Sequence, residues 1–268
     1  MKKNADHRDQ GVRAKKHLGQ HFLKDPSVSA RIAGLLAESQ DLDILEVGPG
    51  TGALTQPLLQ RFGNRVHVVE IDPESVTFLQ NADWLASERV HTADLLRSTP
   101  DDLGLSGAFA VAGNFPYNIS SQILFKVLEW RDRVPECVGM FQKEVADRVC
   151  AAHGSKTYGI LSVLLQTYYT CEYCFTVGPD AFIPPPKVQS GVIRLVRKRE
   201  KDPEGVEYET LRHLVKAAFG LRRKTLRNAL RAGGYDPLTI PDEWLGQRAE
   251  QLSPADFVSL ARNVKRIT

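Results

Sequence analysis

Short apolar runs alternate with helical stretches through the first half of this 268-residue chain. The stretches between the runs have helical spacing, as expected of amphipathic helices. Strands that alternate with helices form βαβ units with right-handed crossovers, so the sequence predicts an α/β fold on a parallel sheet. The expected strands are 43–47, 65–71, 89–91, 109–113 and 137–141, and the expected helices are 54–61, 74–80, 120–130 and 142–150.

The second half of the chain changes character at a charged segment without periodicity, residues 197–209. Such a segment is typical of a linker, and we place a domain boundary near Glu200 to Glu204. Before the linker, an aromatic run at 167–175 is strand-like. Beyond the linker, helical spacing returns. Ser253 is expected to cap the last helix. We therefore predict a domain of residues 1–200, whose residues 1–18 form a basic and mobile arm, and a small all-α domain of residues 201–268. The expected C-terminal helices are 211–218, 225–231 and 254–263.

A glycine-rich turn, Glu46-Val-Gly-Pro-Gly-Thr-Gly52, follows the first predicted strand. Glycine at 48, 50 and 52 lets backbone N–H groups approach a ligand without a Cβ in the way. Such a turn alone could equally bind a dinucleotide. The GxGxG spacing and the leading Glu46, which suits ordering of the loop around a cationic methionine group, favour S-adenosylmethionine (SAM).

Acidic residues stand at the ends of the next two predicted strands, Glu70 and Asp94. Glu70 can accept both ribose hydroxyls, which serves SAM and NAD alike, and Asp94 can accept a hydrogen bond from an adenine amine. The plain alternative is a pair of solvated strand-end acids. Because open α/β sheets bind ligands at the carboxyl ends of their strands, we expect both acids to lie at one adenosine site.

Asn114-Phe-Pro-Tyr117 follows the fourth predicted strand and is the most specific motif of the chain. An adenine amine is a poor nucleophile because its lone pair is delocalised into the ring. The Asn114 side-chain oxygen and the Phe115 carbonyl can accept its two hydrogens and direct the lone pair outward, while Tyr117 can stack on a flipped-out base. In isolation the same four residues could form an ordinary Asx turn. Their place downstream of a SAM-like turn favours the catalytic interpretation.

Basic residues cluster although the formal net charge is only +3. Seven Lys and Arg and no Asp or Glu lie between Leu211 and Arg231, which is typical of a polyanion-binding surface. Helical spacing places Leu226 and Leu230 inward. A merely solvated basic face is the alternative, and Lys15, Lys16 and His17 could add to the surface. The expected RNA-binding residues are Arg222, Arg223, Lys224 and Arg227.

The four cysteines do not predict a metal site. Cys171 and Cys174 have ligand spacing, but no second cysteine pair or nearby histidine pair completes a zinc site. The chain also has neither a long apolar run nor an apolar stretch behind its first residues, so we expect no membrane span and no secretory signal. These features predict a cytoplasmic protein with reduced thiols and no bound metal.

Eight motifs occur in the order found in a known family, and together they cover the chain from about Gly19 to the C-terminus. With them the chain resembles the small-subunit ribosomal RNA adenine dimethyltransferases, the KsgA/RsmA family. The motifs are Gly19-Gln-His-Phe-Leu-Lys-Asp25, Glu46-Val-Gly-Pro-Gly-Thr-Gly52, Val69-Glu-Ile-Asp72, Asn114-Phe-Pro-Tyr-Asn-Ile-Ser120, Gln142-Lys-Glu144, Tyr158-Gly-Ile-Leu-Ser162, Ala181-Phe-Ile-Pro-Pro-Pro-Lys-Val188 and Arg222-Arg-Lys-Thr-Leu-Arg-Asn228.

The resemblance implies a Rossmann-like SAM-dependent methyltransferase fold with a helical C-terminal domain. It implies dimethylation of two adjacent adenosines near the 3′ end of 16S rRNA in the assembling 30S subunit, and we expect a monomer. Asn114 and Tyr117 would hold the target adenine, and Phe182 would cover its other face. The implied SAM site, together with Gly50 of the turn, is His21, Leu23, Gly48, Glu70, Asp94 and Asn114.

Two positions depart from the family pattern. The family usually has Asn at His21, which puts a side-chain contact to SAM in question there. Phe115 replaces a more usual Leu or Ile, which matters little if only its carbonyl acts. Three other functions remain open from the sequence: a 23S rRNA methyltransferase of the macrolide-resistance type, a non-enzymatic assembly or transcription factor on the same scaffold, and, more distantly, a nicotinamide dehydrogenase.

Overall fold

The computed structural model describes residues 12–37, 39, 41–198 and 202–267. Residues 1–11 of the expected basic arm and residues 199–201 of the expected linker lie outside the described residues. Contacts divide the chain into two compact units: the first ends at Ala146 and resumes over Tyr173–Val196, and the second comprises Asp147–Glu172 and Arg197–Thr268. This division differs from the expected one at 200/201, because residues 147–172 group with the C-terminal helices.

A mixed seven-stranded sheet organises the chain, with strand order β4-β3-β2-β5-β6-β9-β7. Strands β2 to β6 pair in parallel, as the sequence predicts, whereas β9 runs antiparallel to β6. Only the parallel part of the sheet was expected. The strands are β2 (Asp43–Val47), β3 (Val66–Glu70), β4 (Val90–Thr92), β5 (Phe109–Asn114), β6 (Glu136–Gln142), β7 (Tyr169–Val177) and β9 (Ser190–Arg197). A separate two-stranded sheet pairs β1 (Phe22–Leu23) with β8 (Phe182–Ile183).

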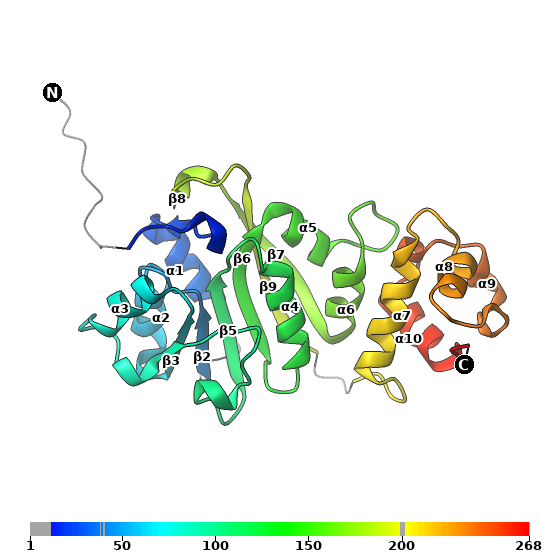
Figure 1. Cartoon of the computed structure of the whole chain (residues 1–268), viewed down its shortest axis with the longest axis horizontal. Helices are drawn as coiled ribbons and strands as arrows, with labels where there is room; N and C mark the ends of the chain where they lie inside the picture. The colour runs from blue at the N-terminus through cyan, green and yellow to red at the C-terminus, as the bar shows by residue number, and fades with distance from the viewer. Residues whose placement is uncertain (1–11, 38, 40, 199–201, 268) are drawn as a thin grey trace. The chain divides into compact units, whose positions relative to one another are not determined.

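Helices α1, α2 and α3 lie on one side of the strands and α4 on the other (Figure 1). Their bounds are α1 (Pro26–Leu35), α2 (Thr55–Phe62), α3 (Pro73–Gln80) and α4 (Ser120–Glu129). The starts of α1 and α3 follow one local rule. The side chains of Asp25 and Asp72 accept backbone N–H groups of the first turn, and proline stands at the next position. Of these four helices, only α1 was not predicted.

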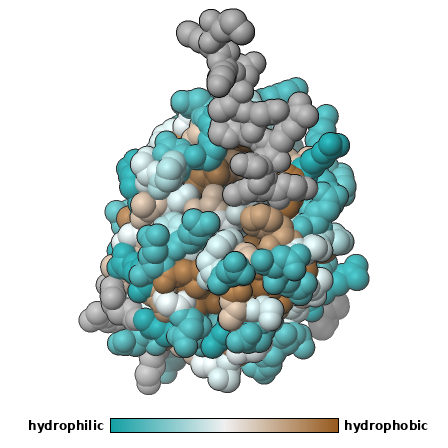
Figure 2. Space-filling view, turned by 90° about the vertical axis from the view of Figure 1, so that its left-hand side faces the viewer, coloured by the Kyte–Doolittle hydropathy of each residue, from teal (hydrophilic) through white to brown (hydrophobic). Residues whose placement is uncertain are grey.

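The central strands are mostly apolar, and Ile44, Val68 and Ala110 are fully buried. Continuous apolar runs are expected where a parallel sheet is covered on both faces. On the face that Figure 2 shows, hydrophilic side chains surround smaller apolar areas. Strand order reverses between β2 and β5, so the connections that follow these two strands run in opposite directions. Open α/β sheets bind ligands at such a topological switch point.

The second unit is helical apart from its share of β7, and its helices pack α6 on α7, α7 on α8, and α10 on both α6 and α7. Leu226 and Leu230 are fully buried, as predicted, and Ser253 caps the last helix through the N–H of Asp256. The expected strand at 167–175 begins later, because its first two residues end α6. The helices are α6 (Ile160–Tyr168), α7 (Tyr208–Gly220), α8 (Leu226–Ala232), α9 (Asp242–Leu245) and α10 (Pro254–Asn263), and α5 (Lys143–Cys150) spans the boundary of the units.

Short 3-10 turns link these elements: η1 (Lys16–Leu18), η2 (Gly63–Arg65), η3 (Ser87–Arg89), η4 (Asp101–Leu103), η5 (Pro179–Ala181), η6 (Pro237–Thr239) and η7 (Ala249–Gln251).

Among the described residues, no helix has the length and apolar content needed to cross a membrane. The four cysteines, all within the described part of the chain, form no disulfide bond.

Candidate active site

A cavity of about 210 Å³ lies in the first unit at the carboxyl ends of β2, β3 and β5. It occupies the switch point of the sheet, as expected for a ligand site in this class of fold. Eight residues singled out from the sequence line it, although they come from five separate parts of the chain. They are His21, Gly48, Gly50, Glu70, Asp94, Asn114, Phe115 and Tyr117.

The glycine turn forms one wall of the cavity. Gly48 and Gly50 adopt φ of 67° and 56°, a left-handed conformation that favours glycine. A Cβ on Gly50 would lie 2.8 Å from the Phe22 ring, and one on Gly48 would lie 3.6 Å from Pro116. The turn therefore packs directly against the loop that contains Asn114, and a side chain at residue 50 would displace Phe22.

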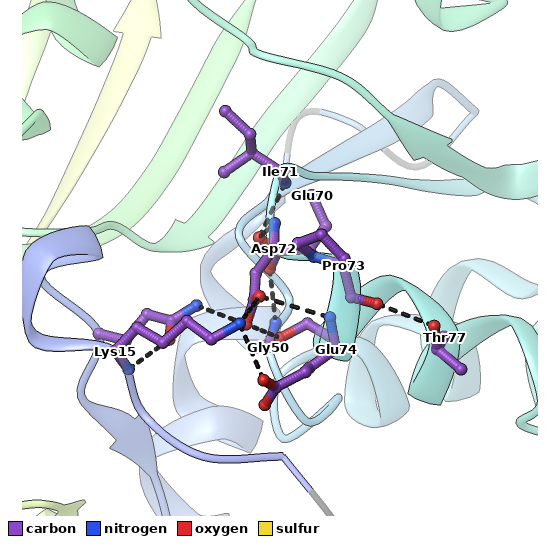
Figure 3. A network of polar contacts seen from close by, with 10 residues as sticks. Lys15, Gly50, Glu70, Ile71, Asp72, Pro73, Glu74 and Thr77 are labelled. Carbon is purple, nitrogen blue, oxygen red and sulfur yellow. Dashed lines mark hydrogen bonds and ion pairs between the residues drawn. The ribbon is translucent and has the colours of Figure 1, made fainter.

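Glu70 is fixed at the cavity wall by backbone donors (Figure 3). Its Oε1 accepts the N–H groups of Ile71 at 2.8 Å and Asp72 at 2.9 Å, and its Oε2 accepts that of Gly50 at 3.3 Å. Burial raises the pKa of Glu70, and these backbone hydrogen bonds oppose that rise. A carboxylate held in this way has acceptor capacity left for ribose hydroxyls.

Glu46 differs from Glu70 in its surroundings. It is only 1% exposed, does not line the cavity, and its Oε2 has no hydrogen-bond partner within the described part of the chain. Burial raises the pKa of Glu46 to about 8. The Glu46 side chain is therefore buried and does not line the cavity.

Asp94 also lines the cavity and is partly exposed. Its Oδ1 accepts the N–H of Leu96 at 3.0 Å, and its Oδ2 lies 3.5 Å from Arg97 Nε. The first contact orients the carboxylate from its own loop. Asp94 can therefore accept a hydrogen bond from a ligand amine at the cavity.

The Asn114 side chain is oriented by the N-terminal segment, since its Nδ2 donates to the carbonyl of His21 at 2.8 Å. An amide has one donor group and one acceptor oxygen, so Oδ1 is left to accept. Phe115 is 1% exposed, and its ring packs on Phe141 with centroids 4.7 Å apart. The ring therefore anchors the loop, and the peptide group of residue 115 is the part of Phe115 suited to ligand contact.

Tyr117 is half-buried at the cavity. Its hydroxyl lies 2.5 Å from Ser190 Oγ, and its ring lies 5.3 Å from the His21 ring at an interplanar angle of 34°. The tyrosine is thus held through its hydroxyl and through its ring, and it is not part of the hydrophobic core. Sequence inspection missed Ser190, which is 73 residues away and has no motif of its own.

The segment before β1 forms another wall, through Leu18, Gly19 and Gln20. Lys15 forms ion pairs with Asp72 and, at 3.1 Å, with Glu74 (Figure 3). At the other end, Asn118 Nδ2 donates to the His17 carbonyl at 3.2 Å. This part of the expected arm therefore has fixed partners beside the cavity.

Two residues implied by the resemblance do not line the cavity. Leu23 and Phe182 pair across β1 and β8, and both belong to the hydrophobic core, Leu23 at 5% and Phe182 at 1% exposed. Their burial follows from the small sheet, whose inner side packs on the main core. Neither side chain lines this cavity, and the roles of Phe182 toward a target base and of Leu23 toward SAM stay predictions.

Several lining residues, most of them inside the quoted motifs, have no role predicted from the sequence, because their side chains carry little chemical signal. Ile71 is the most informative, because a large apolar side chain that is 52% exposed beside Glu70 offers a flat contact for an adenine ring. An apolar residue directly after a strand-end acid was the available clue. The others include Gln20, Phe22, Leu95, Leu96, Asn118 and Ile119.

The predicted RNA-binding residues belong to the second unit, around the turn between α7 and α8. Arg223, Lys224 and Arg227 are exposed. Arg222 is also exposed, but its guanidinium donates to the carbonyls of Lys156 and Tyr158. It therefore supports the loop before α6, besides any role toward RNA.

The donors and acceptors of the cavity fit SAM. The glycine turn, Glu70 and Asp94 offer acceptors and close backbone approach to an adenosine and a charged amino acid group, and Ile71 adds an apolar surface. No group of three or more His, Cys, Asp or Glu suited to a metal ion occurs among the residues described.

Comparison with known proteins agrees with this geometry. The ribosomal RNA adenine dimethylase family matches residues 11–264. The chain is 50% identical over 253 residues to the ribosomal RNA small subunit methyltransferase A of Porphyromonas gingivalis, covering 93% of this chain and 96% of that protein. It is 47% identical over 254 residues to the protein of the same name from Flavobacterium johnsoniae, covering 95% and 97%.

Two solved structures share the fold along nearly the whole chain. A dimethyladenosine transferase from Plasmodium falciparum superimposes with a TM-score of 0.74 at 24% identity, covering 90% of this chain and 96% of that one. The 23S rRNA methyltransferase ErmE superimposes with a TM-score of 0.69 at 27% identity, covering 90% and 98%. With the motifs, the cavity and the extent of these matches in agreement, the chain belongs to the ribosomal RNA adenine dimethylase family.

Proposed function

We propose that this protein dimethylates the N6 amines of two adjacent adenosines near the 3′ end of 16S rRNA, with SAM as methyl donor, during assembly of the small subunit. The observation that supports it best is the Asn114 amide, whose Nδ2 is bound and whose Oδ1 remains to accept at the SAM-like cavity. The names of the P. gingivalis and F. johnsoniae relatives support the small-subunit target.

Gly48, Gly50, Glu70, Asp94 and Asn114 would hold SAM in the cavity. Glu70 would accept the ribose hydroxyls and Asp94 the adenine amine. His21 would contribute through its main chain, and Leu23 would support the site from the core side. When bound, SAM supplies a sulfonium methyl group as the electrophile.

Asn114 Oδ1 and the Phe115 carbonyl would accept the two hydrogens of the target amine. Both acceptors draw the lone pair out of conjugation with the purine, which makes the nitrogen a better nucleophile. Tyr117 would stack on the base, as aromatic side chains do on bases taken out of a helix. The orientation of these residues thus supplies most of the rate enhancement. The target amine loses its proton after its nitrogen has attacked the methyl group.

We propose residues 1–200 as the catalytic domain and residues 201–268 as the RNA-binding domain. Arg223, Lys224 and Arg227 would contact phosphates, with Arg222 holding the neighbouring loop. The target would be 16S rRNA in the assembling 30S subunit. We further propose that the protein acts as a monomer in the cytoplasm and without a metal ion.

The direct test is to incubate the protein with labelled SAM and unmethylated 30S subunits and to map modified nucleotides by mass spectrometry. We expect two adjacent dimethyladenosines near the 3′ end of 16S rRNA. Asn114→Ala should lower the rate at least about 100-fold, because one of the two amine acceptors is lost. Asn81→Ala, the same exchange at an exposed position after α3, is the control. Normal activity of Asn114→Ala would refute the proposed role of Asn114.

The similarity to ErmE favours one alternative, methylation of 23S rRNA. Parallel assays with 30S and 50S subunits decide between the two. Label confined to 23S rRNA would reject the small-subunit assignment while leaving the adenine chemistry intact.

A further inference from the structure

We propose that His21 is a positioning residue for the target adenine and does not bind SAM through its side chain. This inference rests on the proposed function. It derives from a circuit of contacts around the cavity residues. His21 contacts both Asn114 and Pro184, and Ser190 contacts Tyr117. The chain itself joins Pro184 to Ser190 through residues 185–189.

The first contact is made by the main chain. The carbonyl of His21 accepts Asn114 Nδ2 at 2.8 Å. Turning the amide over would place its oxygen against the carbonyl oxygen, which is unfavourable because both atoms are acceptors. The backbone at residue 21 therefore decides which end of Asn114 faces the target amine.

The second contact uses the imidazole. His21 Nδ1 lies 2.8 Å from the carbonyl oxygen of Pro184, and since a carbonyl only accepts, Nδ1 is the donor. Pro184 begins the segment 184–189, which leads from β8 to β9 and includes the exposed Val188. The side chain is thus committed to the segment that leads to Ser190, the residue that contacts the Tyr117 hydroxyl.

The third contact closes the circuit. Ser190, fully buried at the start of β9, meets the Tyr117 hydroxyl at 2.5 Å, while the His21 ring lies 5.3 Å from the Tyr117 ring. His21 therefore holds the first residue of segment 184–189, and Tyr117 is joined to the residue just after it. Asn114 and Tyr117, the two residues that would hold the base, are fixed relative to each other through His21.

Three variants separate the parts of the His21 side chain. His21→Asn keeps a nitrogen donor at the same distance from Cβ, His21→Phe keeps a ring without a donor, and His21→Ala removes both. All three retain the main-chain carbonyl that orients Asn114. SAM affinity is measured by calorimetry, and kcat and KM are measured with unmethylated 30S subunits.

We expect the SAM dissociation constant to stay within about threefold in all three variants. We expect kcat to fall at least about tenfold in His21→Ala and His21→Phe and to stay within about threefold of the wild type in His21→Asn, because a net hydrogen bond is worth about a factor of ten. A merely structural role would not spare SAM binding while lowering kcat. His213→Asn, the same exchange on α7, is the matched control.

Two results would overturn the proposal: a loss of SAM affinity in His21→Ala that equals the loss of kcat, or a normal kcat in His21→Ala. If His21→Ala fails to fold, Ser190→Ala tests the same circuit and should lower kcat with SAM affinity retained.

Wild-type activity on 50S subunits alone would refute the proposed function, and the same variants would then be measured on 50S subunits. A wild type that binds SAM and methylates neither particle would refute both.

Discussion

At the scale of residues, two buried glutamates next to the same glycine turn have different surroundings. Three backbone N–H groups bind Glu70, whereas Glu46 has one oxygen without a partner among the described residues. Burial raises the pKa of each. Glu46, whose pKa rises to about 8, is therefore the acid whose protonation should change the stability of the protein near neutral pH.

We expect Glu46→Gln to flatten the dependence of stability on pH. The pKa of Glu46 rises from 4.5 in the unfolded chain to about 8 in the folded protein, so folding favours the protonated form. Its contribution to stability is fully present below pH 4.5 and is lost as pH rises toward and through 8. A shift of that size corresponds to about 5 kcal/mol at about 1.4 kcal/mol per pKa unit.

The measurement is urea unfolding of the ligand-free protein at intervals between pH 5 and 8.5. Wild type should lose stability across this window, and Glu46→Gln, which resembles the protonated acid, should lose much less. Glu88→Gln, at an exposed position in η3, is the control. Parallel profiles for wild type and Glu46→Gln would contradict the prediction.

At the scale of elements, the segment from Lys15 to Gln20 joins two sides of the cavity. Lys15 binds the cap of α3 through Asp72, and the His17 carbonyl binds Asn118 behind the catalytic loop. Leu18 and Gln20 line the cavity between these contacts. The segment is therefore a wall of the cavity, and an ion pair attaches it to α3.

We expect Lys15→Ala to speed SAM dissociation by roughly two- to fivefold, because an ion pair that is partly exposed contributes modestly to holding the wall. The rate is measured by stopped-flow displacement, and the effect should shrink at high salt. Lys16→Ala removes an exposed neighbouring charge and serves as control. Equal dissociation rates for the two variants would exclude Lys15 as the attachment.

At the scale of the whole molecule, the chain crosses three times between its two compact units, after Ala146, after Glu172 and after Val196. Residues 147–172 leave the first unit, and α6 packs on α7 and α10 before the chain returns through β7. Arg222 then donates to the carbonyls of Lys156 and Tyr158, residues more than 60 positions away in sequence. This basic cluster thus contains Arg222, which supports a loop, and exposed residues such as Arg223, which we propose to contact RNA.

We expect Arg222→Ala and Arg223→Ala to differ. Arg223→Ala should weaken binding to 30S subunits and lower the slope of log affinity against log salt by about 1, with the melting temperature unchanged. Arg222→Ala should also lower the melting temperature, because two backbone acceptors lose their donor. Filter binding over a salt series and thermal unfolding provide the data, with Lys265→Ala as control. Identical effects of both changes would contradict the assignment.

Much of the fold and of the site could be predicted from local sequence. The alternation of apolar runs and helical stretches predicted β2 to β6 and their parallel pairing, and Ser253 was a recognisable cap. The glycine turn, Glu70 and Asp94 could be assigned to one cavity because parallel strands place their carboxyl ends at one edge. These features depend on short-range patterns or on a general rule of topology.

The sequence alone determined the fold class, the family and the motifs that we propose to contact SAM and a target base. Only the tertiary structure decided that Leu23 and Phe182 enter the core, that Arg222 supports a loop, and that His21 joins Asn114 to Pro184. The physical reason is that orientation and burial depend on partners distant in sequence. A motif shows which groups a side chain offers, but the packed neighbours decide which of those groups remain available.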